Sequence, residues 1–218
     1  MISYKSQTWI VVALTVFTRF PQSFAAKKNF VTCGSIVKLL NTDYNVRLHS
    51  HDVKYGSGSG QQSVTAIELK EDVNSHWIIK APTDKYCERG EPIKCDEIIR
   101  LEHLTTKKNL HSHYFASPLS GDQEVSAYGN NGFGDTGDHW QLLCSNDVWV
   151  RDARVRFRHV DTGAYLGLSG RSFGRPIAGQ MEVAGLGSLH RDGTRWTTAE
   201  GLYIAPKEKE AEYAHTEL

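Results

Sequence analysis

The chain repeats one unit three times, and this internal repetition constrains its fold more than any other feature. The pentapeptide Arg47 to His51 returns almost unchanged as Asn109 to His113. Other landmarks recur in constant order in each copy: an apolar residue, a glycine followed four residues later by a valine, and a closing tryptophan. The landmarks are Leu39, Leu101 and Phe157; Gly60, Gly121 and Gly179; Val64, Val125 and Val183; and Trp77, Trp140 and Trp196. The chain is therefore predicted to hold three units of about 60 residues each.

Each unit is predicted to contain four short strands. In the first unit, residues 36–41 have strand composition and residues 45–51 alternate with period two, while the glycine-rich segment 55–60 has few side chains to pack. Units of this length are too long for common solenoids, and three units are too few for a propeller. We therefore expect an all-β fold of twelve short strands with pseudo-threefold symmetry, namely a β-trefoil, in which closure removes exposed sheet edges.

The repeat boundaries and the two ends of the chain suggest five segments. We expect a signal peptide over residues 1–25, because Lys5 precedes an apolar run that ends before Ala25. The units then cover 28–82, 90–145 and 146–200, and an exposed tail covers 206–218. The tail ends in residues that resemble an endoplasmic reticulum retrieval signal, with threonine in place of aspartate: His215, Thr216, Glu217 and Leu218. Together these ends predict location in the lumen of the endoplasmic reticulum.

Charge and hydropathy argue against two classes of partner. The chain has 25 basic and 25 acidic residues, so its formal net charge is zero. A neutral chain has no long-range field that would gather nucleic acid or an anionic membrane surface. The apolar run before Ala25 is shorter than the roughly 18–20 residues that a membrane-spanning helix needs. We expect no nucleic-acid partner and no membrane insertion.

Four cysteines in a chain bound for an oxidising compartment predict two disulfides, and three pairings are possible. Only seven residues separate Cys87 from Cys95, which favours that pair. Cys33 would then pair with Cys144. No Cys-x-x-Cys motif is present, which argues against a zinc ribbon or a thioredoxin-type site.

The repeated histidines are the first candidates for a binding site. His49 and His51 lie two residues apart on a predicted strand, so both should face one side, and His111 with His113 repeats the arrangement. A zinc-binding His-x-His pair is one interpretation. The third unit, however, has Gly167 at the equivalent position, so hydrogen-bonded structural histidines are the favoured interpretation, with no metal and no cofactor. A third interpretation is that these histidines, together with Arg47, recognise a glycan or a peptide.

Three arginines alternate with apolar residues in the third unit. Arg154, Arg156 and Arg158 flank Val155 and Phe157, which places the three guanidinium groups on one strand face. A solvated outer face is the favoured interpretation, and a contact with an acidic partner is the alternative. The sequence contains no Gly-x-Ser-x-Gly motif or paired catalytic carboxylates, so we expect a protein that is not an enzyme.

The repeated features resemble a known family, the MIR domain, and over its mature length the chain resembles the stromal cell-derived factor 2 family. The matching segments are residues 32–35, 45–53, 55–64, 87–90, 117–121 and 149–152. The resemblance implies a β-trefoil in the endoplasmic reticulum that acts in quality control. It implies association with a J-domain co-chaperone and its heat-shock ATPase partner, contact with unfolded clients, and a link to protein O-mannosylation without a transferase's catalytic machinery.

A carbohydrate-binding module for mannose-type glycans is the alternative function. Sugar sites commonly place an aromatic ring against the sugar face and surround it with polar groups. Three tyrosines near polar loops could supply such a ring: Tyr55, Tyr114 and Tyr128.

Overall fold

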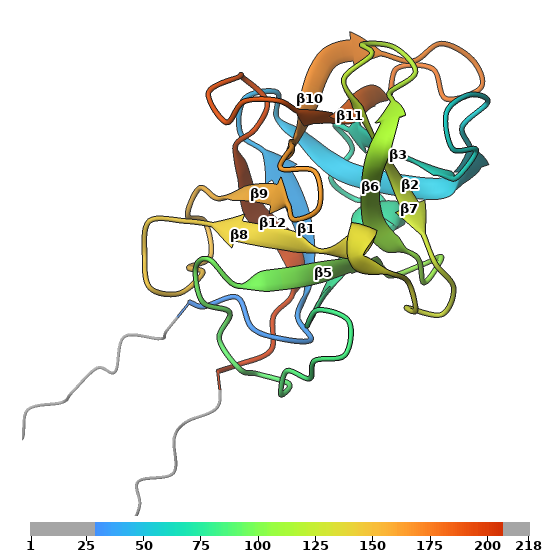
Figure 1. Cartoon of the computed structure of the whole chain (residues 1–218). Helices are drawn as coiled ribbons and strands as arrows, with labels where there is room; N and C mark the ends of the chain where they lie inside the picture. The colour runs from blue at the N-terminus through green and yellow to red at the C-terminus, as the bar shows by residue number, and fades with distance from the viewer. Residues whose placement is uncertain (1–28, 207–218) are drawn as a thin grey trace, which may run out of the picture.

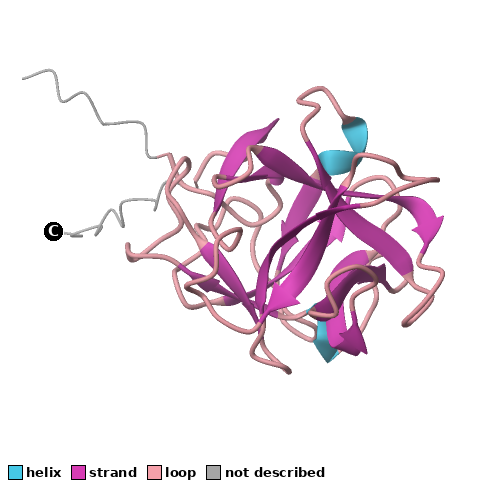
Figure 2. Cartoon of the chain, turned by 90° about the horizontal axis from the view of Figure 1, so that it is seen from above, coloured by secondary structure: helices cyan, strands magenta, loops and turns pink. Residues whose placement is uncertain are grey.

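The computed structural model describes residues 29–206 and is built almost entirely from β-strands. The expected signal peptide and retrieval-like end fall outside the described residues. The strands are β1 (Ile36–Asn41), β2 (Val46–Lys54), β3 (Gln62–Ile67), β4 (Trp77–Lys80), β5 (Ile98–His103), β6 (Asn109–Ala116), β7 (Gln123–Tyr128), β8 (Trp140–Leu143), β9 (Arg156–His159), β10 (Tyr165–Ser172), β11 (Met181–Leu186) and β12 (Trp196–Leu202). Two short 3-10 helices, η1 (Val73–Ser75) and η2 (Thr136–Asp138), complete the fold, and Figure 2 shows how little helix there is. The predicted all-β class with twelve strands is confirmed. None of the helices in residues 29–206 is long and apolar enough to cross a membrane.

Six strands close into a ring. β1 pairs with β4, β4 with β5, β5 with β8, and β8 with β9, all antiparallel. β12 pairs with β1, and an isolated bridge from Val155 to Trp196 joins the start of β9 to β12. Each sequence unit supplies its first and fourth strands to this ring. Ring closure leaves no free edge in the ring for pairing with another chain.

The second and third strands of each unit form a hairpin, and the three hairpins also pair with one another. The hairpins are β2–β3, β6–β7 and β10–β11. Further pairings join β3 to β7, β7 to β11 and β11 to β3. In Figure 1 the labelled hairpin strands lie at one end of the molecule and the ring strands at the other. The three hairpins thus contact each other directly at one end of the ring.

The apolar, valine and tryptophan landmarks of the repeat form the core, whereas the landmark glycines are exposed. The three closing tryptophans are 0% exposed, as are Leu39, Leu101 and Phe157 and the three landmark valines. Each tryptophan indole N–H donates to a backbone carbonyl of the strand that follows the apolar landmark: Trp77 to Leu48, Trp140 to Leu110 and Trp196 to Leu166, at 2.9 to 3.0 Å. The tryptophans are therefore fixed both by packing and by a repeated hydrogen bond.

The disulfide pairing predicted from the sequence is wrong. The bridges join Cys33 to Cys87 and Cys95 to Cys144, with sequence separations of 54 and 49 residues. In each of the first two units the fourth strand pairs with the first, so the end of the unit lies next to its beginning. The segment around Cys33 lies beside the loop that follows Cys87, and the Cys33 backbone N–H donates to Glu91 O at 2.8 Å. Proximity in the folded ring outweighs the short sequence separation between Cys87 and Cys95.

Candidate functional site

The histidine pairs lie on β2 and β6 at equivalent positions of the first two hairpins. His49 and His111 are only 4% and 5% exposed. The imidazole Nδ1 of His49 lies 3.0 Å from Asp72 Oδ2, and Nδ1 of His111 lies 3.0 Å from Asp138 Oδ1. Because a carboxylate accepts, each Nδ1–H donates. Both histidines are therefore held by hydrogen bonds to aspartate carboxylates.

Strand alternation brings the two histidines of the first pair together. The rings of His49 and His51 meet edge to face with centroids 4.9 Å apart, and Nε2 of His49 lies 3.1 Å from Nδ1 of His51. Burial lowers the pKa of His51, and the neighbouring His49 lowers it further. The other ring nitrogen of His51 is buried without a hydrogen-bond partner in the described part of the chain. This pair thus favours the uncharged form of His51.

The second pair has a different arrangement. The rings of His111 and His113 also meet edge to face, with their centroids 5.1 Å apart. His113 Nε2, however, bonds to Glu124 Oε1 at 3.0 Å instead of to its neighbour. Glu124 is 0% exposed and also accepts a bond from the Ser59 backbone N–H on the first hairpin, at 3.2 Å. Glu124 therefore links the hairpins of the first two units.

The aspartates beside His49 and His111 lie in or just before the two short helices that precede the tryptophans. Asp72 and Asp135 precede η1 and η2, and each lies five residues before a tryptophan. In the first unit Asp72 accepts bonds from both His49 and Ser75 Oγ. Burial opposes ionisation of Asp72, but these hydrogen bonds and the charge of His49 bring its pKa below the usual range. The constant distance to the tryptophan is a signal in the sequence that could have revealed these aspartates.

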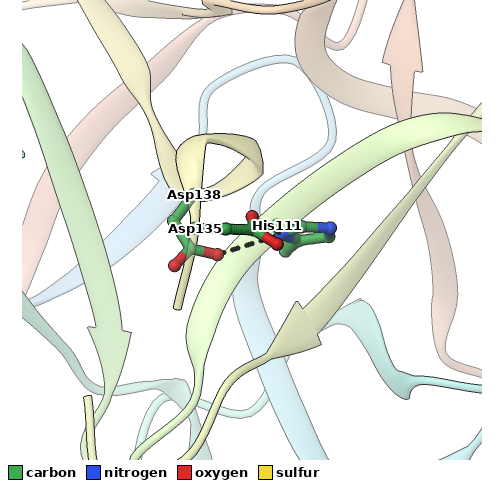
Figure 3. A group of neighbouring side chains, drawn as sticks. All are labelled: His111, Asp135 and Asp138. Carbon is green, nitrogen blue, oxygen red and sulfur yellow. Dashed lines mark hydrogen bonds and ion pairs between the residues drawn. The ribbon is translucent and has the colours of Figure 1, made fainter. Parts of the chain in front are cut away.

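The second unit carries one carboxylate more than the first. Asp138 stands where the first unit has Ser75, two residues before the tryptophan. His111 Nδ1 lies 3.0 Å from Asp138 Oδ1 and 3.6 Å from Asp135 Oδ1. Figure 3 shows the imidazole facing both carboxylates. The three donor atoms lie within 4.8 Å of one another, which is close enough for one metal ion.

Arg47 is not available at the surface. Its side chain is 3% exposed, and its Nη2 and Nε atoms donate to the two carboxylate oxygens of Glu200 at 2.7 and 2.9 Å. The bidentate contact holds the pKa of Glu200 at about 2. The structure thus places Arg47 in an internal contact between β2 and β12, apart from the histidines that the sequence grouped with it.

Two of the three arginines of the third unit are exposed. Val155 and Phe157 are buried, while Arg154 and Arg158 are exposed. Arg156 is half-buried, and its Nε donates to Thr194 Oγ1 at 3.3 Å. Two of the three guanidinium groups therefore remain accessible to an acidic partner.

Two exposed aromatic residues at the end of β6 were only partly anticipated by the sequence. Tyr114 is 82% exposed and Phe115 is 50% exposed. At the equivalent positions the first unit has Asp52 and Val53, and the third has glycine and arginine. We call Tyr114 and Phe115 the hairpin aromatic pair. The pair is peculiar to the second unit, so the pseudo-threefold surface is chemically asymmetric.

The hairpin aromatic pair borders a shallow cavity of about 440 Å³ between the second and third units. Polar side chains from both units line the cavity together with several glycines: Asp122, Gln123, Thr162, Gly121, Gly163, Gly185 and Gly187. The Tyr114 hydroxyl donates to the Asp161 carbonyl at 3.4 Å. An aromatic ring beside amide, hydroxyl and carboxylate groups is suited to a polar ligand with an apolar face.

The other two tyrosines considered for sugar binding are placed differently. Tyr55 is 7% exposed, its hydroxyl contacts the carbonyls of Val64 and Val125 at 2.9 and 3.0 Å, and burial raises its pKa. Tyr55 is therefore a core residue and the expectation that it could face a sugar is wrong. Tyr128 is 38% exposed and packs against His111, with ring centroids 4.8 Å apart.

Comparison with known proteins places the chain in a family. Residues 38–170 match the MIR domain. The chain is 54% identical over 195 residues to stromal cell-derived factor 2 of Mus musculus, which covers 89% of this chain and 92% of the relative. The crystal structure of the SDF2-like protein from Arabidopsis thaliana superposes with a TM-score of 0.79 at 44% identity, covering 82% of this chain and 99% of that chain.

A third similarity is to part of a larger assembly. The structure of the S. cerevisiae protein O-mannosyltransferase Pmt1-Pmt2 complex bound to the sugar donor matches with a TM-score of 0.70 at 26% identity. The match covers 86% of this chain and 29% of that chain, so the similarity concerns one part of the transferase. The identity to the curated relatives is much higher and extends over most of both chains, and the chain therefore belongs to the stromal cell-derived factor 2 family of MIR-domain proteins.

Proposed function

We propose that this chain is a non-enzymatic adaptor of the endoplasmic reticulum lumen that acts in protein quality control. In this role it binds a J-domain co-chaperone with its heat-shock ATPase partner, and it contacts unfolded clients. We also propose that its scaffold is a β-trefoil, since six strands form a ring and three mutually paired hairpins lie at one end of it. Membership of the stromal cell-derived factor 2 family supports the proposal.

The observation that carries the proposal is the exposure of the hairpin aromatic pair. Aromatic side chains supply much of the binding energy at protein interfaces when a partner buries them. Tyr114 and Phe115 protrude from a β-hairpin whose base is fixed by buried hydrogen bonds, including Ser112 Oγ to Glu124 O at 2.7 Å. A rigid base with exposed aromatics is suited to contact with a partner at little conformational cost.

The ionisable side chains near the hairpins support a binding role rather than catalysis. His49, His113 and Glu124 are occupied by hydrogen bonds to neighbouring side chains. A general acid or base needs contact with a substrate proton. These groups instead hold one hairpin to the next element.

A pull-down from lumen extract tests the adaptor proposal. The bait is the purified protein, compared with Tyr114→Ser/Phe115→Ser and with Asp52→Ser/Val53→Ser, which changes the equivalent positions of the first unit. We expect the wild-type chain and the first-unit variant to retain a J-domain co-chaperone and its ATPase partner. The second-unit variant should lose most of both. Retention of neither protein by the wild-type chain would contradict the proposal.

We also propose a link to protein O-mannosylation. The MIR domain and the similarity to part of an O-mannosyltransferase complex support this link. A comparison of mannosylated proteins in cells with and without the chain tests it. Unchanged occupancy of mannosylated serine and threonine residues would count against the link.

Binding of a mannose-type glycan is the second candidate, because the cavity joins the exposed ring of Tyr114 to Gln123 and Thr162. Titration of a mannose oligosaccharide, followed by nuclear magnetic resonance, tests this candidate. Shifts at cavity residues that vanish in Tyr114→Ser and persist in Tyr128→Ser would support a sugar site. Release of the retained proteins by free mannose in the pull-down would favour the glycan over the adaptor.

A further inference from the structure

We propose that the second unit contains a binding site for one Zn²⁺ ion, formed by His111, Asp135 and Asp138. The site is independent of the adaptor and glycan proposals. It lies at the base of the β6–β7 hairpin, whereas those proposals rest on the hairpin aromatic pair and the cavity beside it. The three residues come from β6 and from the η2 segment that precedes Trp140. Both elements are held by the fold, since the Trp140 indole N–H donates to the Leu110 carbonyl beside His111.

The distances between the donor atoms suit a single ion. His111 Nδ1 is 3.0 Å from Asp138 Oδ1 and 3.6 Å from Asp135 Oδ1. Ligand atoms about 2.0–2.1 Å from a tetrahedral zinc ion lie roughly 3.3 Å apart. The two separations from Nδ1 lie on either side of that value, so each carboxylate oxygen can share one zinc ion with Nδ1, and all three atoms lie within 4.8 Å of one another.

The charge around Asp138 gives an independent reason for a cation. Asp138 is 0% exposed, and within residues 29–206 its ion pairing is with His111 and not with a lysine or arginine. Its Oδ2 accepts a bond from Asn109 Nδ2 at 2.9 Å. The amide oxygen of Asn109 is buried and has no hydrogen-bond partner in the described structure. A buried carboxylate that has no lysine or arginine partner among the described residues is strongly stabilised by a positive ion.

Zinc would replace a hydrogen bond that is already in place. Nδ1 of His111 gives its lone pair to the ion once its proton has moved to Nε2, so the ring stays a neutral imidazole. Asp135 and Asp138 supply negative oxygen ligands, so the ion and two carboxylates together are neutral. The Asp135 side chain is 57% exposed, which leaves the fourth position open to water or to a partner's side chain.

The first and third units lack one or more of the three zinc ligands. At the equivalent place the first unit has His49 and Asp72 but Ser75 instead of a second aspartate. The Oδ2 atom of Asp72 is shared by His49 and Ser75. The third unit has Gly167 in place of the histidine. The chain thus contains its own nearly matched control for the site.

Zinc titration of the purified full chain, without a polyhistidine tag and in competition with a chromogenic chelator, tests the proposal. We expect one ion per chain. Asp135→Asn preserves the cap that Asp135 gives to the Gly137 N–H at 2.9 Å, yet it should weaken zinc binding at least tenfold. Asp72→Asn is the matched change in the first unit and should leave the affinity within twofold.

A gain of binding provides the second arm. Ser75→Asp introduces the missing carboxylate into the first unit, and we expect it to raise the stoichiometry to two ions. Folding of every variant is checked by circular dichroism and by nuclear magnetic resonance, in which the His111 ring nitrogens should shift on zinc addition. Absence of binding to the wild-type chain, or equal affinities for wild type and Asp135→Asn, would overturn the proposal. Loss of the ion in Asp72→Asn alone would place it on the first histidine pair instead and would also overturn it.

Discussion

The indole nitrogen of Trp140 donates a hydrogen bond to the backbone carbonyl of Leu110 across 2.9 Å, deep in the core. The bond joins the start of β8 to β6, one residue before His111. The same bond recurs from Trp77 to Leu48 and from Trp196 to Leu166. The closing tryptophan of each unit therefore holds the hairpin of that unit to the ring.

We predict that Trp140→Phe lowers the free energy of unfolding by about 2–4 kcal/mol, because it removes ring volume and leaves a buried carbonyl without its donor. Urea denaturation measures the change. The control is Trp149→Phe, since Trp149 is also 0% exposed but its indole nitrogen has no hydrogen-bond partner among the described residues. Equal losses in the two variants would show that the indole hydrogen bond contributes nothing.

The disulfide pairing gives a second prediction. Proteolysis under non-reducing conditions should release one linked peptide pair containing Cys33 and Cys87 and another containing Cys95 and Cys144. Because the Cys33–Cys87 bridge closes a segment of about 55 residues, Cys33→Ser/Cys87→Ser should lower the free energy of unfolding by about 4 kcal/mol through the entropy of the unfolded chain. A linked pair containing Cys87 and Cys95 would contradict this assignment.

Stability should fall in mild acid because of His103. This side chain is 0% exposed, and it is fixed between Thr106 Oγ1 at 2.9 Å and the Asn74 carbonyl at 2.8 Å. Burial lowers its pKa from 6.5 to about 4. Between these values the unfolded chain binds the proton and the folded chain does not, so stability is lost as pH falls from 6.5 to 4, by about 3 kcal/mol at the lower limit.

Asparagine occupies the position equivalent to His103 in the first unit. Asn41 donates to the Gly193 carbonyl at 2.6 Å, as His103 does to Asn74. We therefore expect His103→Asn to fold and to show a shallower decline of stability between pH 6.5 and 4. Burial also lowers the pKa of His159, so part of the decline should remain. An unchanged pH profile in His103→Asn would rule out the contribution of His103.

Gly137 is predicted to be essential for the position of His111. A Cβ atom at residue 137 would lie 2.3 Å from Cε1 of the imidazole. Gly137→Ala should displace the ring and lower the free energy of unfolding by about 1–3 kcal/mol. Gly187→Ala is the control, because no atom lies within 4 Å of the added Cβ. Nuclear magnetic resonance of the His111 ring, combined with thermal unfolding, measures both effects.

The order of elements and the identity of core residues could be predicted from the sequence. The repeated leucine, valine and tryptophan positions are buried, and the alternation of His49 with Ser50 and His51 correctly indicated a strand. These features depend on local periodicity, which the chain carries in every short segment, and threefold repetition makes the signal stronger.

Contacts between distant residues were decided only by the tertiary structure. The sequence placed Tyr55 among candidate sugar-binding residues, but the meeting of β3 and β7 buries its hydroxyl between Val64 and Val125. It also paired Cys87 with Cys95, because separation along the chain says nothing about how a closed ring returns to its start. Cys33 and Cys95 each lie six residues before a landmark leucine, so the repeat itself indicated equivalent roles for them.

At the histidine site, too, the sequence predicted the strand positions but not the hydrogen-bond partners. The strand pattern determined that His111 and His113 share one face, but their partners Asp138 and Glu124 are reached 27 and 11 residues later in the chain. Side-chain hydrogen bonds require atoms within about 3 Å, and only the packing of β6 against η2 and β7 provides that proximity. The sequence alone therefore determined the repeated strands and their buried faces, whereas tertiary packing, including closure of the ring, determined which buried charges and cysteines meet.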